Sequence, residues 1–312
     1  MDTATVARFE ASRDRLASIA YRLLGSAADA EDTVQDAFLR WQAADRTYVE
    51  VPEAWLTKIV TNLALDRLRS AKTRHERSVG AWMPEPLLDG DPMLGPADTV
   101  EQRESVTLAV LTLMERLSPV ERAVYVLHEA FAYRHAEIAE ILDVTVSASQ
   151  QHLHRARGRI TVARNATDID QAGARRIVAA FLDAASSGRT DQLIALLTDD
   201  ATGISDGFGG LAAKLVRYAT PHRLAVAVRA GFTPTPAKRR LAGGSPSFHA
   251  VVVNGCPALL VTLDDRVLGV AILEMRHDKI AGMRSIAAPT RLGRLTHEWR
   301  RRDHDAPLID SW

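Results

Sequence analysis

The sequence predicts a multidomain protein with two all-helical domains, an acidic linker between them, and a C-terminal α+β domain with a curved antiparallel sheet. Three observations support this fold class. Residues 6–78 and 105–164 show helical spacing of apolar residues almost throughout. Residues 79–104 hold six acidic residues against one basic residue, with many Pro and Gly, as linkers do. Beyond residue 200, short apolar runs end at turn residues, which is typical of strands in a meander.

Composition sets broad limits on the kind of protein. The chain has 312 residues, of which 46% are hydrophobic and 25% charged, and its formal net charge is zero. A nucleic-acid interface must therefore come from local patches and not from bulk charge. The single Cys256 excludes an internal disulfide and argues against a cysteine zinc site, so we expect no metal and no cofactor. Neither a signal peptide nor a membrane-spanning run is evident, which favours a cytoplasmic protein.

The first informative segment is an acidic amphipathic helix at residues 29–41. Its predicted buried stripe consists of Ala30, Val34, Ala37, Phe38 and Trp41, which recur at helical spacing. Five polar residues remain outside that stripe: Asp29, Glu31, Asp32, Gln35 and Asp36. Acidic residues also suit the positive end of a helix dipole, so a solvated helix start is the alternative explanation.

A second helix, at residues 54–69, carries aromatic and apolar residues on one side and turns basic toward its end. The other side, whose donors we expect to point outward, carries Lys58, Thr61, Asn62, Leu65 and Arg69. Residues 54–77 hold six basic residues against two acidic ones, enough to follow a phosphate backbone. An ordinary basic surface helix is the alternative.

Residues 117–160 predict a helix-turn-helix. Ser118 fits the N-cap of a helix, with Pro119 in its first turn and Glu121 completing a capping box. A short helix at 136–142, a turn at 143–145 and a second helix at 147–160 follow, the last with Ser147 and Gln150 as another capping box. The side chains left outside, suited to base edges and phosphates in a major groove, are Gln150, Gln151, His154, Arg155 and Arg159. A plain helical hairpin is the alternative.

Residues 168–290 predict two helices followed by an antiparallel meander. The expected strands are 201–205, 248–254, 258–263, 267–276 and 279–286, with hairpin turns at 264–265 and 277–278. Helices followed by such a meander suggest a sheet curved around a pocket. The tail, 291–312, contains Arg300-Arg301-Arg302 and is either a solvated end or a strap across another domain.

In this order the parts resemble an extracytoplasmic-function sigma factor of the sigma-70 family over nearly all of residues 6–164. The resemblance implies a region-two domain at 1–78, a linker at 79–104 and a region-four helix-turn-helix domain at 105–165. It implies an alternative sigma factor that binds core RNA polymerase at the beta-prime clamp and the beta flap. Such a factor recognises the −35 and −10 elements of promoter DNA and initiates transcription.

The resemblance also assigns roles to single residues. Polymerase contacts would come from Asp29, Glu31, Asp32, Gln35 and Asp36. Contacts to the −10 region would come from Lys58, Asn62, Arg67 and Arg69, while the loop 46–52 would help to hold a base flipped out of the opening duplex. The −35 major groove would receive Gln150, Gln151, His154, Arg155 and Arg159.

The C-terminal part resembles the SnoaL-like fold, a cone-shaped domain used by polyketide cyclases and ketosteroid isomerases. Some sigma factors, the SigJ-like subgroup, carry this domain as an extension. Three segments resemble motifs of that subgroup: residues 82–86 in the linker, 206–210 with a lysine displaced to Lys214, and 288–292, of which only the Pro and Leu are retained. The implied regulatory contacts are Trp82, Pro84, Glu85, Pro86, Asp206, Gly207, Gly210 and Lys214.

By this resemblance the extension regulates the sigma domains in cis, and a separate anti-sigma factor is compatible but not required. Binding of a small-molecule ligand in the C-terminal pocket is a further possibility. Retained isomerase or cyclase activity would need a general base, for which Asp206, His222, His249 and His277 are candidates, yet no spacing among them argues catalysis. We therefore predict no catalytic site and no enzyme. A ligand-sensing helix-turn-helix repressor is the remaining alternative, and it would leave helices 29–41 and 54–69 without a function.

Overall fold

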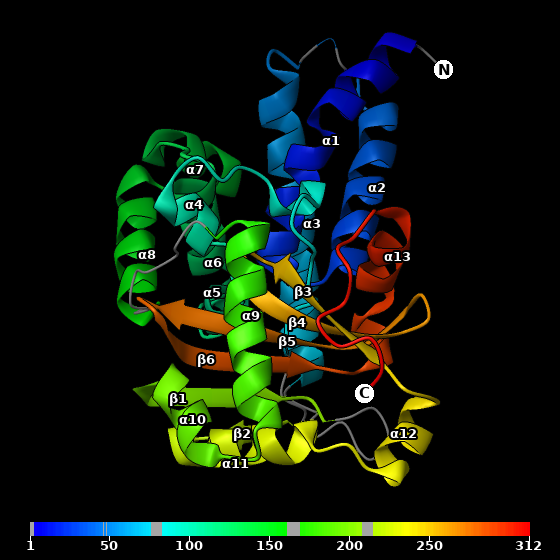
Figure 1. Ribbon diagram of the computed structural model, residues 1–312. Coiled ribbons are helices and arrows are strands. Elements are labelled where there is room, and N and C mark those ends of the chain that lie inside the picture. Colours follow the sequence, from blue (N-terminus) through cyan, green and yellow to red (C-terminus); the bar gives the residue numbers. More distant parts are fainter. Residues whose placement is uncertain (1–2, 46, 48, 76–82, 161–168, 208–214) are drawn as a thin grey trace. The chain divides into compact units, whose positions relative to one another are not determined.

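A computed structural model describes residues 3–45, 47, 49–75, 83–160, 169–207 and 215–312 (Figure 1). The chain divides into two compact units. The first comprises Met1–Glu85 together with Gly90–Val162, and the second comprises Pro86–Asp89 together with Ala163–Trp312. Both predicted helical domains therefore belong to one unit, and a short piece of the predicted linker belongs to the C-terminal unit.

Three long helices open the first unit. They are α1 (Thr3–Leu24), α2 (Ala27–Ala43) and α3 (Pro52–His75). The predicted buried stripe of α2 is confirmed for Ala30, Val34, Ala37 and Trp41, while Phe38 is only half-buried. The Trp41 indole nitrogen donates to the carbonyl oxygen of Thr5 at 3.1 Å, and its ring lies 5.5 Å from that of Trp55. Trp41 thus fastens α2 to both α1 and α3.

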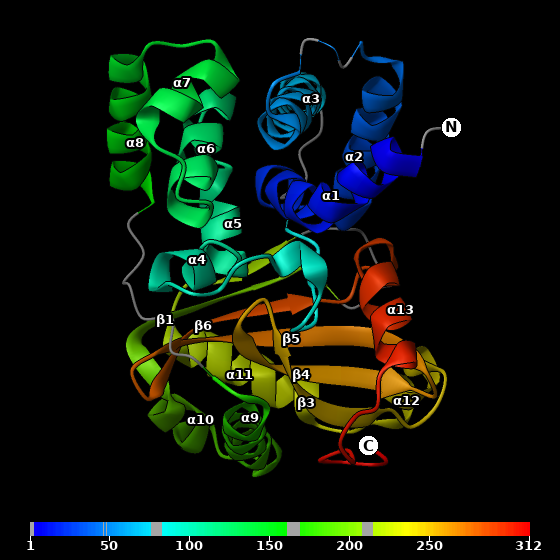
Figure 2. The ribbon, with the colours of Figure 1, turned by 90° about the horizontal axis from the view of Figure 1, so that it is seen from above.

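The second half of this unit contains shorter helices, among which α8 packs against both α6 and α7 (Figure 2). They are η2 (Pro92–Leu94), α4 (Val100–Glu104), α5 (Leu108–Met114), α6 (Pro119–Tyr125), the π-helical turn η3 (Val126–Ala130), α7 (His135–Leu142) and α8 (Val146–Arg159). The helix-turn-helix is confirmed as α7 and α8. The capping box of Ser118 and Glu121 is also confirmed. The predicted N-cap of the second helix was wrong: Thr145, not Ser147, accepts from the Ala148 amide.

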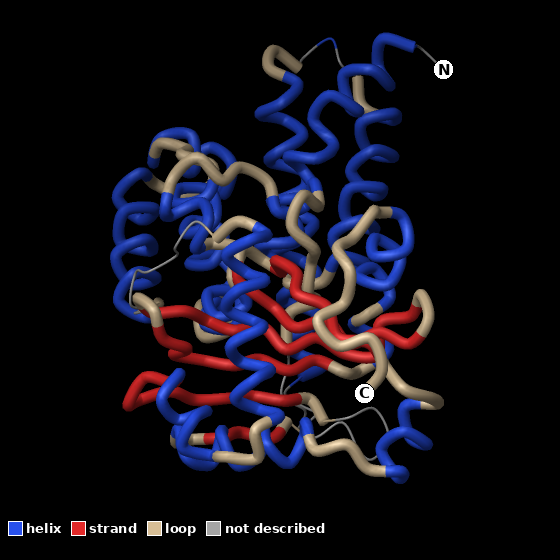
Figure 3. The backbone as a smooth tube through the Cα atoms, in the orientation of Figure 1, coloured by secondary structure: helices blue, strands red, loops and turns tan. Residues whose placement is uncertain are grey.

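The second unit combines helices with a curved, open sheet, shown by the red strands in Figure 3. Its first part holds α9 (Gln171–Ser186), α10 (Thr190–Leu196), β1 (Leu197–Ser205), β2 (Val216–Tyr218), α11 (Pro221–Phe232) and α12 (Pro236–Ala242). Its second part holds β3 (Ser247–Val253), β4 (Cys256–Leu263), β5 (Arg266–Arg276), β6 (Lys279–Ile286), η4 (Pro289–Arg291) and α13 (Gly293–Arg301).

The strand order is β2-β1-β6-β5-β4-β3. Strands β3 to β6 form the predicted antiparallel meander, with Asp264 and His277 at positive φ in its turns. Strand β1 pairs with β6 in parallel, which periodicity alone did not predict. Local alternation of side chains fixes which face of a strand is buried, but not which strand becomes its neighbour.

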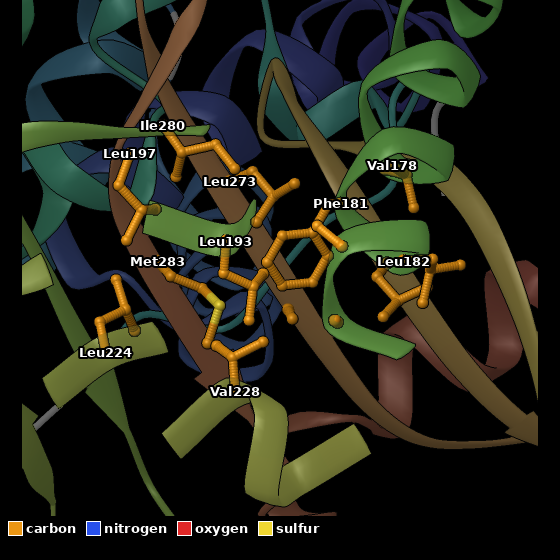
Figure 4. Close-up of a cluster of buried hydrophobic side chains, with 14 of the residues drawn as sticks. Val178, Phe181, Leu182, Leu193, Leu197, Leu224, Val228, Leu273, Ile280 and Met283 are labelled. Atoms are coloured by element: carbon orange, nitrogen blue, oxygen red, sulfur yellow. The ribbon is translucent and has the colours of Figure 1, made fainter. Parts of the chain in front are cut away.

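The core of the second unit lies between this sheet and helices α9, α10 and α11 (Figure 4). Phe181 of α9 lies beside Leu273 of the sheet and Val228 of α11 lies beside Met283, with Leu182 and Leu224 in the same cluster. All five side chains apart from Met283 are at least 95% buried. Full burial of such a side chain stabilises the fold by roughly 1.5–3 kcal/mol, so this cluster contributes strongly to the stability of the unit.

Two segments cover the otherwise free edge strand β3. Leu88 forms a bridge with Val253, and Ile309 of the tail forms one with Phe248. The tail adds the ring of Trp312 against Phe248, with 5.6 Å between ring centroids. The tail matches neither alternative for residues 291–312, because it is ordered and packs as a strap within its own unit.

Candidate nucleic-acid interface

The acidic residues of α2 surround one arginine of α3. Arg67 donates from Nη2 to Asp36 at 2.7 Å, and its Nη1 lies 3.9 Å from carboxylate oxygens of both Asp29 and Asp32. The structure thus brings three of the predicted polymerase contacts together with a predicted −10 contact. Glu31 and Gln35 lie on the exposed side of the same helix. A cationic centre among three carboxylates reduces their mutual repulsion and holds the acidic surface together.

The predicted DNA-binding side of α3 differs from expectation. Thr61 is fully buried and Leu65 is 3% exposed, so these two residues do not point outward. Helices α6 and α7 pack against α3, and the contacts of Lys58 place α7 on this side. Lys58 donates to a carboxylate oxygen of Asp143 at 2.7 Å and to the carbonyl oxygen of Glu140 at 2.9 Å.

The remaining predicted −10 contacts are partly accessible. Asn62 is half-buried, and Arg69 is exposed and pairs with Asp66 at 3.0 Å one turn earlier. The hydroxyl of Thr57, on the side of α3 that faces the helix-turn-helix, lies 3.1 Å from the hydroxyl of Tyr133. Of the predicted loop 46–52, positions 46 and 48 lie outside the described residues.

On α8, the polar residues divide into two groups. Gln150, Gln151 and His154 are exposed and face away from the buried positions Leu153 and Ala156. Arg155 and Arg159 are also about half exposed, but both reach back to Glu121 of α6, at 3.0 and 2.6 Å. Amide side chains pair well with adenine edges in a major groove, so the first group is the chemically suited reading surface.

Residue-by-residue interpretation of the sequence missed the acids that hold α8. Glu121 was recognised only as a capping residue, and Glu129 was not recognised at all. Burial alone would raise the pKa of Glu121, but the Ser118 amide and the Arg155 guanidinium outweigh it and lower that pKa. The signal that could have revealed these pairs is a run of arginines at 155, 157 and 159 with no acid in the same helix.

The linker motif holds the start of α2. Glu85 accepts a hydrogen bond from the Ala27 amide at 2.8 Å through its carboxylate, and its carbonyl oxygen accepts from the Tyr21 hydroxyl at 2.7 Å. Pro84 and Pro86 are buried, while Trp82 lies outside the described residues. This predicted regulatory motif therefore completes the N-terminal cap of the acidic helix.

The next linker residues pair within the second unit. The backbone amide of Leu87 donates to the side-chain oxygen of Asn254 at 2.8 Å. The backbone amide of Asn254 donates to the Leu87 carbonyl oxygen at 2.9 Å. Asn254 is fully buried and takes a positive φ of 51°. Arg302 in turn donates to the carbonyl oxygen of Asp89. A segment without periodic signal thus becomes an extra strand-like edge of the sheet.

Two further predicted motifs meet at Asp206. Its carboxylate accepts from the amides of Ala287 and Ala288 at 2.7 and 3.2 Å, and lies 3.5 Å from Arg291. Gly207 follows at φ 79°. Gly210 and Lys214 lie outside the described residues. Asp206 therefore ties the loop after β1 to the segment 287–291, which suits a structural role.

The histidines considered as general bases occupy structural positions. His249 packs against Trp299 and His304, with ring centroids 4.8 and 5.7 Å apart, and burial lowers its pKa. His277 forms a hairpin turn, and His222 lies in the first turn of α11. Among the described residues, no cluster of three His, Cys, Asp or Glu side chains could hold a metal ion. Within that same part of the chain, every helix is too short or too polar to cross a membrane.

Comparison with known proteins agrees with this arrangement. Residues 8–74 match the family model of sigma-70 region 2, and residues 107–160 match that of sigma-70 region 4. The chain is 41% identical over 216 residues to the ECF RNA polymerase sigma factor SigJ of Mycobacterium tuberculosis, covering 68% of this chain and 69% of that protein. It is 32% identical over 297 residues to the probable ECF RNA polymerase sigma factor SigI of the same organism, covering 94% and 96%.

A solved structure resembles both units. The crystal structure of the extracytoplasmic-function sigma factor SigJ of M. tuberculosis matches 92% of this chain and 98% of its own, at a TM-score of 0.68 and 30% identity. The similarity therefore extends beyond the two helical domains to the α+β domain with its open sheet.

Proposed function

This chain belongs to the extracytoplasmic-function RNA polymerase sigma factors, in the SigJ-like subgroup, and on that basis we propose how its parts share the work of transcription initiation. As an alternative sigma factor it acts in transcription initiation, and the assignment of tasks to its residues is our proposal. The observation that carries the proposal is the exposed side of α8, where two amides and an imidazole face away from the domain core.

Helix α8 reads the −35 element. In a helix-turn-helix the second helix enters the major groove, and the N-terminal part of that helix meets base edges. Gln150 and Gln151 lie in this part and carry both a donor and an acceptor, which suits adenine. His154 lies one turn further along the exposed side.

Helices α2 and α3 serve polymerase and the −10 element. The carboxylates that surround Arg67, together with Glu31 and Gln35, offer an acidic surface for a basic partner surface on core polymerase. Lys58, Asn62 and Arg69 line one side of α3 and contact the −10 region once that side is accessible. One promoter then contacts α3 through its −10 element and α8 through its −35 element.

The C-terminal domain regulates the sigma domains through the linker. Glu85 caps α2 in one unit, and two residues later Leu87 pairs with Asn254 in the other. Because only Pro86 separates these two residues, loss of the Leu87 pairing frees the chain that positions Glu85. The motif thus couples the state of the C-terminal domain to the start of the polymerase-binding helix.

The test is transcription from a promoter library with core polymerase and the full-length protein. We expect specific initiation, and we expect Q150A and Q151A to lower selectivity at the −35 element with little change in the choice of −10 sequence. The matched control is Q192A, which removes an exposed glutamine from α10. If the full-length protein neither initiates nor binds core polymerase, the division of tasks is refuted.

A further inference from the structure

Two buried carboxylates hold the recognition helix from both sides. Glu121 belongs to α6 and Glu129 to the π-helical turn η3 that follows it, and their side chains are only 5% and 6% exposed. Neither belongs to the surface that faces DNA. Both carboxylates form ion pairs with arginines of α8.

Glu121 binds one flank of α8. Its Oε1 accepts from Arg155 Nε at 3.0 Å, and its Oε2 accepts from Arg159 Nη1 at 2.6 Å. The second oxygen also accepts from the backbone amide of Ser118 at 2.9 Å. Both oxygens are therefore occupied, and α8 is fixed to the start of α6 at two points one helical turn apart.

Glu129 binds the opposite flank. Its Oε1 accepts from Arg157 Nε at 2.9 Å and from Arg157 Nη2 at 2.6 Å. Each residue of an α-helix turns the direction of its side chain by about 100°, so Arg157 lies about 200° around the axis from Arg155 and from Arg159. The two carboxylates consequently grip α8 from different sides, and the exposed side with Gln151 and His154 lies outside both grips.

We propose that Glu121 and Glu129 are positioning residues for −35 recognition, which fix the rotation of α8 about its own axis. This inference rests on the proposed reading of the −35 element by α8. A hydrogen bond between a side chain and a base edge needs alignment within a fraction of an ångström, so a small rotation of α8 weakens discrimination between bases more than contact with phosphates. Arg155, Arg157 and Arg159 then orient the helix, and base reading falls to Gln150, Gln151 and His154.

The experiment compares full-length variants in complex with core polymerase. The probe is the −35 sequence selected by the wild-type holoenzyme from a randomised promoter library, together with its single-base variants. For E129Q we expect the preference for the selected sequence to fall by about fivefold or more, the size of one lost base contact, with an unchanged salt dependence of binding. The charge-swapped pair E129R/R157E restores the preference. Because Glu121 also caps α6, E121Q carries a cost in stability and serves as the second variant, judged only below its melting temperature.

The matched control is E137Q, which alters a half-exposed glutamate that caps α7 at the Arg134 amide and pairs with the Arg134 side chain. If Glu121 and Glu129 only stabilise the domain, their variants lose binding equally on every sequence and keep the preference for the selected −35 sequence. That result overturns the proposal. So does a preference that E129Q leaves unchanged. A wild-type holoenzyme without any −35 preference would instead refute the proposed function of α8, so the two failures are distinguishable.

Discussion

The ammonium of Lys58 lies 2.7 Å from a carboxylate oxygen of Asp143, and this ion pair joins the helix assigned to the −10 element to the turn of the helix-turn-helix. Asp143 takes a left-handed conformation at the end of α7, which directs it out of that helix. Thr61 and Leu65 are buried on the same side of α3. Under the proposed assignment, Lys58 is released to contact promoter DNA when α3 and α7 separate.

Removing this ion pair should favour the separated state. We expect D143N to increase binding of a single-stranded −10 oligonucleotide by the free full-length protein by about fivefold at most, because exposed ion pairs contribute no more than about 1 kcal/mol. Fluorescence anisotropy measures the affinity. The control is D66N, which removes a carboxylate from α3 that pairs with Arg69 one turn later in the same helix. Equal gains in D143N and D66N would indicate a general charge effect and contradict the prediction.

The cap that Glu85 provides to α2 should contribute measurably to stability. E85A leaves the Ala27 amide without its carboxylate partner, and the loss of a helix cap costs about 1 kcal/mol. We expect a lower midpoint in urea unfolding followed by circular dichroism. E10A, at an exposed glutamate of α1 paired with Arg13, is the matched control and should leave the midpoint in place. A midpoint that E85A does not move would argue against the cap.

Asn254 should hold the linker segment through its side chain as well as its backbone. N254G keeps the freedom to adopt positive φ but removes the acceptor of the buried Leu87 amide, which costs about 1–3 kcal/mol. We expect faster proteolysis near residues 86–89, followed by mass spectrometry. N254A adds strain at φ 51° and should show a larger effect. The prediction fails if N254G resembles the wild type while N254A alone is cleaved faster, because backbone strain would then explain everything.

The pair of His135 and Ser149 should make stability depend on pH. Burial, His128 and Arg157 all lower the pKa of His135, whose Nδ1 lies 2.9 Å from the Ser149 hydroxyl. A lowered folded-state pKa means that the unfolded chain takes up the proton first, as pH falls below about 6.5. The free energy of unfolding should thus decline from pH 7.5 toward pH 5. H135Q should show a shallower decline in urea titrations, and parallel curves would contradict this assignment.

Much of the fold follows from local patterns in the sequence. The buried stripe of α2, the capping box at Ser118, the helix-turn-helix and the four-stranded meander were all predicted from spacing and turn residues. Each is a local property, because helical and strand periodicities place side chains relative to their own element. The error at Ser147 has the same origin: Thr145 and Ser147 lie two residues apart and can both cap, and the backbone of the turn places Thr145 at the N-cap.

The candidate site was only partly predictable. Polar residues of α2, α3 and α8 could be named from the sequence, but their partners could not. Arg67 collects three carboxylates of another helix, and Glu121 collects two arginines 34 and 38 residues away. Such pairs depend on which helices become neighbours. A solvated arginine and an arginine bound to a buried carboxylate cannot be told apart in a single sequence.

By itself, the sequence determined the order of the domains, the type of each element and the family resemblance, since all three depend on residues close together along the chain. Only the tertiary structure decided that Lys58 and Asp143 meet, that the linker residues 87–89 join the edge of β3, and that α8 is held by two buried acids. The physical reason is that these contacts join residues that lie far apart along the chain. Their free energy comes from burial and complementary charge in the folded chain, which no local pattern records.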